Sequence, residues 1–172
     1  MPRKVKLAMQ NISYCGGCEI ALADLGQTLI NLLDEKIDLI YAPLFMSSKD
    51  YGEVDILFIT GAVRNLEDVE QTKKAREKAK YLVSFGSCAC FGGIPGLANL
   101  YDKDQLVDAA FKDAPSLKKD KAVLPHVDIP RLVENIKPVD EYVKVDFVLP
   151  GCPPPPPMIE DFLNRLLSKV HV

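Results

Sequence analysis

The sequence predicts one α/β domain over residues 1–172, built on a flavodoxin-like parallel sheet of order 2-1-3-4-5 with helices on both faces. Two observations support this prediction. Five short apolar runs have the length of strands and lack polar alternation, as is typical of parallel strands buried on both sides. Segments with helical spacing separate most of these runs, and alternating strands and helices are typical of α/β sheets. At 172 residues and 48% hydrophobic content, the chain has the size and composition of one globular core.

The first half of the chain contains three predicted strands and one predicted helix. Val5–Met9 is a short apolar run, and leucines at helical spacing predict a helix from Cys18 to Leu33. Ile37–Ala42 predicts the second strand, which Pro43 ends, and Val54–Thr60 predicts the third.

The second half contains two further strands and two helices. A charged helix with a weak apolar stripe is predicted at about Glu67–Lys80, and much of it is expected to face water. Tyr81–Phe85 and Val145–Leu149 predict the fourth and fifth strands. The final helix has the clearest pattern, with apolar residues at Ile159, Phe162, Leu163, Leu166, Leu167 and Val170.

The stretch at about 91–144 does not fit a simple strand–helix–strand unit. It is interrupted by proline and glycine and contains short amphipathic pieces at Leu106–Phe111 and around Leu132 and Ile136. Long insertions beside a site often dock a partner or cover the site. The sequence leaves open whether this one is such a docking excursion or an irregular surface segment.

Composition and charge narrow the class of protein. A formal net charge of −3 gives no reason to expect a nucleic-acid partner. The N-terminus lacks the apolar region of a secretory signal, and no apolar run reaches the roughly 18 residues that cross a bilayer. We therefore expect a cytoplasmic protein without direct membrane insertion, whose cysteines remain thiols.

Five cysteines occur in three clusters, each at the carboxyl end of a predicted strand. They are Cys15 and Cys18, then Cys88 and Cys90, then Cys152. The carboxyl ends of strands in an open α/β sheet form the edge where ligands bind, so these clusters are expected to converge. Converging thiols in a reducing compartment favour a metal or iron–sulfur site.

Other uses of the cysteines are less well supported. A thioredoxin-like dithiol does not require cysteines at two further strand ends. A structural zinc site usually has two paired knuckles, and the single residue between Cys88 and Cys90 is tighter than zinc spacing. Because Cys88 is nearest the strand end and Cys90 suits a small buried apolar position, we predict Cys15, Cys18, Cys88 and Cys152 as the ligands.

Residues beside the cysteines suit this chemistry. Glycine N–H groups can donate to inorganic sulfide, the start of a helix at Cys18 favours thiolate, and the prolines after Cys152 shield the site. Glu19 suits the positive end of that helix, or serves as a proton relay or polar contact at an interface. Arg64 is a candidate for contact with a partner.

At these residues the chain resembles the small, electron-transferring subunit of nickel–iron hydrogenases, a family related to the 20-kDa subunit of complex I. The matching segments are Cys15-Gly-Gly-Cys18-Glu19, Gly86-Ser87-Cys88-Ala89 and Leu149-Pro150-Gly151-Cys152-Pro153-Pro154. The resemblance implies one proximal 4Fe–4S cluster on the same four cysteines. It also implies a nickel–iron centre in a separate large subunit, so that this chain carries no catalytic residue of its own.

Two differences from other members of this family narrow the type of subunit that the chain resembles. Complex I relatives have adjacent cysteines where two glycines separate Cys15 and Cys18, which favours the hydrogenase side over a quinone-linked subunit. The chain stops 20 residues after Cys152, so further clusters are not expected. This similarity to short small subunits of soluble NAD-reducing or bifurcating hydrogenases implies further iron–sulfur and flavin subunits linked to NAD. Membrane-bound members with similarly short small subunits remain an alternative.

Overall fold

The computed structural model describes residues 3–117 and 124–170. Its centre is a parallel five-stranded sheet of order β2-β1-β3-β5-β7. The strands are β1 (Val5–Asn11), β2 (Ile37–Tyr41), β3 (Val54–Thr60), β5 (Ala79–Phe85) and β7 (Phe147–Leu149). Counting only these strands, the order is the predicted 2-1-3-4-5. The labels differ because two short strands that the sequence did not predict, β4 and β6, form a separate sheet.

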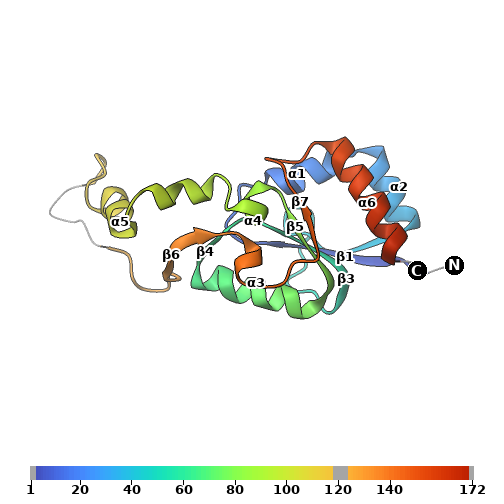
Figure 1. Ribbon diagram of the computed structural model, residues 1–172, viewed down its shortest axis with the longest axis horizontal. Helices are drawn as coiled ribbons and strands as arrows, with labels where there is room; N and C mark the ends of the chain where they lie inside the picture. The colour runs from blue at the N-terminus through green and yellow to red at the C-terminus, as the bar shows by residue number, and fades with distance from the viewer. Residues whose placement is uncertain (1–2, 118–123, 171–172) are drawn as a thin grey trace.

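Helices cover both faces of the sheet (Figure 1). The first core lies under α1 (Gly17–Ala23), α2 (Gln27–Glu35) and α6 (Pro156–Val170), and includes Met9, Phe58 and Phe85. The second lies under α3 (Leu66–Lys78) and α4 (Ser87–Phe91), and includes Leu57 and Leu82. Successive residues of a strand point to opposite faces, so β1, β3 and β5 contribute buried residues to both cores. Every residue of β3 is buried, as the continuous apolar run predicts.

The single helix predicted from Cys18 to Leu33 is wrong, because the chain forms α1 and α2 instead. Helix α1 ends with Asp24 as its C-cap, and Gly26 then adopts a φ of 55° before α2 begins. Positive φ is readily available to glycine and interrupts a right-handed helix. The leucines keep their helical spacing across the break, so periodicity alone did not reveal it. None of the helices in the described ranges is long and apolar enough to cross a membrane.

Between β5 and β7 the chain leaves the body of the molecule as an arm, drawn at the left of Figure 1. We use "the arm" for residues 91–117 and 124–137, which include η1 (Pro95–Leu100), α5 (Lys103–Phe111) and β6 (Leu132–Lys137). Strand β6 pairs antiparallel with β4 (Val63–Asn65), and η3 (Val139–Glu141) follows it. No residue of η1 or α5 is buried.

An ion pair fixes the return of the chain from the arm to the sheet. The guanidinium of Arg76, on α3, pairs with Asp146, immediately before β7. Asp146 also accepts a 2.8 Å hydrogen bond from the backbone N–H of Leu82. Burial alone would raise the pKa of Asp146, but the hydrogen bonds from Arg76 and Leu82 outweigh burial and lower it. The pair therefore places β7, and with it the loop of Cys152, beside β5.

Candidate functional site

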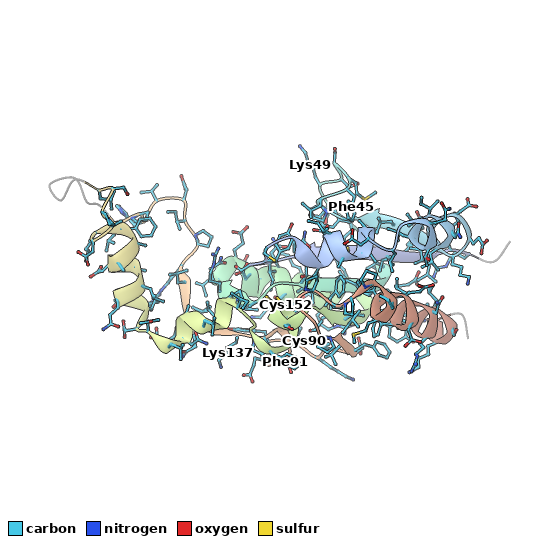
Figure 2. The ribbon with its side chains drawn as sticks, turned by 90° about the horizontal axis from the view of Figure 1, so that it is seen from above. Phe45, Lys49, Cys90, Phe91, Lys137 and Cys152 are labelled. Atoms are coloured by element: carbon cyan, nitrogen blue, oxygen red, sulfur yellow. The ribbon has the colours of Figure 1, made fainter. Side chains whose placement is uncertain are left out.

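Three of the predicted ligands line one large cavity at the carboxyl edge of the sheet. Cys15 follows β1, Cys88 lies in α4 directly after β5, and Cys152 follows β7. All three border a cavity of about 1350 Å³, which we call the cysteine cavity. Figure 2 shows Cys152 between the arm and α6. The topology thus brings together cysteines that are up to 137 positions apart in the sequence (152 − 15).

Cys18, the fourth predicted ligand, lies against the segment that carries Cys88. A Cβ atom added at Gly86 would stand 2.3 Å from the sulfur of Cys18, and Gly86 has a φ of 87°. Only glycine meets both conditions without strain. Gly86 therefore allows the thiol of Cys18 to approach the end of β5.

Hydrogen bonds join the loops of Cys88 and Cys152. The N–H of Gly86 donates to the carbonyl of Leu149 at 2.8 Å, and the N–H of Ser87 donates to the carbonyl of Gly151 at 2.7 Å. In return, the N–H of Gly151 donates to the Ser87 hydroxyl at 3.2 Å. The two cysteine loops thus continue the ladder between β5 and β7 beyond the strands themselves.

The loop of Cys15 is fixed to the other side of the site. The N–H of Ile12 donates to the carbonyl of Thr60, and the N–H of Ala62 donates to the carbonyl of Ser13, both at 3.0 Å. The Ser13 hydroxyl donates to the carboxylate of Asp68 at 2.7 Å. Sequence analysis missed Asp68, although Asn65 and Asp68 form a capping box, whose three-residue spacing was available as a signal.

Burial and the neighbouring sulfurs raise the pKa values of Cys18 and Cys88. Burial raises the pKa of Cys18, a hydrogen bond with Thr60 opposes that effect, and the neighbouring sulfurs of Cys88, Cys15 and Cys152 raise it further. Burial likewise raises the pKa of Cys88. The predicted preference of Cys18 for thiolate at a helix start is therefore outweighed by burial in the bare chain.

Cys90 differs from the other four cysteines. Its side chain is buried, as predicted, and its Sγ donates to the carbonyl of Ser84 at 3.3 Å. Burial raises its pKa to about 11. Cys90 thus packs α4 against β5, and like Cys18 it is absent from the lining of the cysteine cavity.

Four cysteine thiols can hold a zinc ion or an iron–sulfur cluster, and these two groups need different amounts of room. Zinc holds four thiolates at about 2.3 Å each, so its ligands crowd around one point. Within the described ranges, no three His, Cys, Asp or Glu side chains are grouped closely enough to hold a metal ion. Cys15, Cys88 and Cys152 instead border a large cavity, and a set of four cysteines can hold either a 4Fe–4S cluster or a zinc ion.

Comparison with known proteins identifies the family. A family model described as the NADH ubiquinone oxidoreductase 20-kDa subunit matches residues 15–166, nearly the whole chain. The chain belongs to this 20-kDa subunit family.

Two relatives of this chain are subunits of hydrogenases. It is 38% identical over 165 residues to a subunit of the vhu F420-non-reducing hydrogenase of Methanocaldococcus jannaschii, covering 95% of this chain but 56% of that protein. It is 35% identical over 167 residues to the delta subunit of the NAD-reducing hydrogenase HoxS of Cupriavidus necator, covering 96% and 79% respectively. The chain thus spans little more than half of the archaeal relative.

A solved structure supports both the fold and the relationship to hydrogenase subunits. A chain in the crystal structure of an NAD+-reducing NiFe-hydrogenase in the H2-reduced state superposes with a TM-score of 0.90. The two chains are 34% identical, and the match covers 97% of this chain and 93% of the other. The hydrogenase resemblance read from the cysteine motifs and the flavodoxin-like sheet are therefore confirmed.

In this family member, Glu19 is fully buried and bound on two sides. Asn11 donates to one of its carboxylate oxygens at 2.5 Å, and the N–H of Leu44 donates to the other at 3.3 Å. Burial and then the negative charge of Glu19 raise the pKa of Tyr14, next to Cys15. Glu19 therefore joins α1 to β1 and to the loop after β2, a structural role that a helix-dipole effect alone does not describe. Phe45 and Lys49 project from that loop in Figure 2.

Proposed function

We propose that this chain is the electron-transfer subunit of a cytoplasmic nickel–iron hydrogenase. It would hold one proximal 4Fe–4S cluster between the nickel–iron site of a large subunit and a further iron–sulfur or flavin subunit. The observation that carries the proposal is the convergence of Cys15, Cys18, Cys88 and Cys152 from three loops onto one edge of the sheet. The hydrogenase names of its relatives support the same assignment.

Each group around the site has a role in this proposal. The four thiolates would hold the cluster, which when bound would take up and release one electron at a time. Gly16 and Gly17 leave the backbone between Cys15 and Cys18 without side chains, so their N–H groups are accessible to sulfide. Pro154 is buried and lacks an N–H donor, so it would exclude water beside Cys152.

Residues 1–172 would form a single flavodoxin-like iron–sulfur domain with a docking excursion at 91–144. The excursion contains the arm, whose exposed apolar side chains favour docking over an irregular surface segment. Phe91, Leu100, Tyr101 and Val127 are each at least 64% exposed. Large apolar surfaces of this kind mark protein–protein contacts. The large hydrogenase subunit is the partner that the family relationship favours.

The first test is metal content. The chain is to be produced anaerobically, with iron, acid-labile sulfide and zinc measured per chain and the electron paramagnetic resonance spectrum recorded after reduction. We expect about four irons and four sulfides. Single Cys→Ser variants at Cys15, Cys18, Cys88 and Cys152 should lose most of the cluster, whereas the control Cys90→Ala should retain it. Stoichiometric zinc without iron would support a structural zinc module instead.

The second test is the division of labour between subunits. Hydrogen uptake is to be assayed with a viologen dye for the chain alone, for the large subunit alone and for both together. We expect activity only in the combined sample. Activity in this chain alone would contradict the proposal. Quinone reduction without hydrogen uptake in the complex would support the complex I-like, quinone-linked alternative.

A further inference from the structure

Arg64 occupies a position shared by the two cavities of the site region. It lines the cysteine cavity and also a smaller cavity of about 130 Å³, the arm cavity, which lies against η1, α5 and β6. Arg64 is the middle residue of β4, between Val63 and Asn65, which are both buried. Because side chains alternate along a strand, Arg64 points to the opposite, exposed side.

The backbone of Arg64 is held firmly. Its N–H donates to the Asp68 carboxylate at 2.9 Å, and the N–H of Asn65 donates to the same oxygen at 3.2 Å. The N–H of Leu66 donates to the carbonyl of Arg131 at 2.9 Å, and β4 pairs with β6. A side chain presented from a fixed backbone loses less conformational entropy when it binds.

The guanidinium of Arg64 has no acidic partner in the part of the chain that the structure describes. Each ion pair found there joins other residues, including Lys103 with Glu134 at 2.8 Å in the arm cavity. Asp68 already accepts bonds from Ser13 and two backbone N–H groups. Arg131 is close enough to Lys103 to act on its pKa. The charged residues that line the cysteine cavity are the four cations Lys49, Arg64, Lys74 and Lys78 and the three carboxylates Asp50, Glu67 and Asp68, which leaves one positive charge in excess.

The side chains around this charge are apolar and exposed. Ile94 is 66% exposed, Ile129 54%, Leu66 49% and Leu132 38%. An apolar surface of this kind is normally covered by a partner. A partner that covers this surface also buries the guanidinium of Arg64. The partner must then supply a carboxylate, because an unpaired buried charge is strongly unfavourable.

We propose that Arg64 is the anchor that binds a carboxylate of the large hydrogenase subunit, with the flanking apolar side chains packing around that ion pair. This inference rests on the proposed function, which supplies the partner. Arginine suits the role because its planar fork binds carboxylate at two points, and because arginines are enriched among the residues that dominate binding.

The test compares affinities of the iron-loaded chain for the purified large subunit, measured anaerobically by biolayer interferometry. Arg64→Met should weaken binding by about 30-fold or more, since truncating a buried charge pair costs at least about 2 kcal/mol. Arg64→Lys should weaken it by about tenfold, because the two-point contact is lost. The matched control Arg165→Met removes an exposed pair with Asp161 on α6 and should change affinity by less than about twofold.

The outcomes separate this inference from the proposed function. Arg64→Met with normal iron content and unchanged affinity would contradict the anchor alone. Failure of the unaltered chain to bind would contradict both. Arg64→Lys retains the charge and provides the answer if the Met variant does not fold.

A charge-swap scan tests the chemical class of the occupant. Arg64→Glu is combined with single replacements of acidic residues of the large subunit by lysine. Recovery of binding by at least about tenfold in one combination supports a carboxylate partner. If no combination restores binding, a carboxylate is not the occupant and the inference is wrong.

Discussion

The hydroxyl of Ser13 donates a 2.7 Å hydrogen bond to the buried carboxylate of Asp68, 55 residues further along the chain. The same carboxylate oxygen accepts the N–H groups of Arg64 and Asn65. One side chain therefore connects the loop that carries Cys15 to the start of α3. This connection helps to fix the position of Cys15 relative to α3.

Replacing Asp68 with alanine should destabilise the protein by about 2 kcal/mol or more, because it leaves buried donors without an acceptor and removes a helix cap. Urea unfolding followed by circular dichroism measures this change. Asp161→Ala, which removes an exposed carboxylate on α6, is the control and should change stability by no more than about 0.5 kcal/mol. Equal effects of the two substitutions would show that Asp68 has no special connecting role.

Gly86→Ala should disrupt the site directly. The added Cβ would lie 2.3 Å from the sulfur of Cys18, and alanine is strained at a φ of 87°. We expect the iron content per chain to fall by more than half and stability to fall by about 1–3 kcal/mol. Gly96→Ala is the matched control, since a Cβ there meets nothing within 4 Å. Full iron loading of Gly86→Ala would contradict the close approach of Cys18.

The cysteines of the iron-free chain should react with iodoacetamide in a defined order. Cys15 and Cys152 are exposed, whereas Cys90 is buried and has a pKa of about 11. At pH 8 only about one Cys90 thiol in a thousand would be ionised, and the thiolate is the reactive form. Mass spectrometry of timed samples should show Cys15 and Cys152 labelled first and Cys90 labelled only after unfolding. Early labelling of Cys90 would contradict its packing against β5.

The pair between Arg76 and Asp146 should make stability depend on acid pH. The pKa of Asp146 in the folded chain lies below its ordinary value of 3.8. Its contribution is therefore fully present above pH 3.8 and is lost as the pH falls through the folded-state pKa. Asp146→Asn should cost about 1–2 kcal/mol at pH 6 and clearly less at pH 2.5, as measured by urea unfolding. A cost that does not change with pH would assign the effect to packing and not to charge.

The main sheet could be predicted because its strands are continuous apolar runs, as in Val54–Thr60, that only burial on both faces explains. The short elements could not be predicted from the sequence. Helix α4 has five residues, too few for a periodic pattern, and β4 has three. Strand β6 is held partly by Asn99, whose side-chain amide bonds both backbone groups of Ile136 at 2.8 Å. A contact across 37 positions leaves no local signal in the sequence.

The cysteines of the candidate site were easier to predict from the sequence than the residues that hold their loops in place. The cysteines could be recognised in the sequence by their residue type and by their positions at the ends of predicted strands. Asp68 looks like one more acid on a charged helix, and only the fold reveals that Ser13 reaches it. The burial of Glu19 likewise depends on the loop at Leu44, which lies beside Glu19 only in the folded chain.

The arm has a practical consequence for handling this protein. Its apolar side chains, with Leu100 at 78% and Phe91 at 68% exposed, have no cover within the described residues. Such surfaces promote self-association when a polypeptide is overproduced without its natural binding partner. Recombinant preparations of this chain alone should therefore contain soluble oligomers beside the monomer, and co-expression should raise the monomer fraction that is available for spectroscopy.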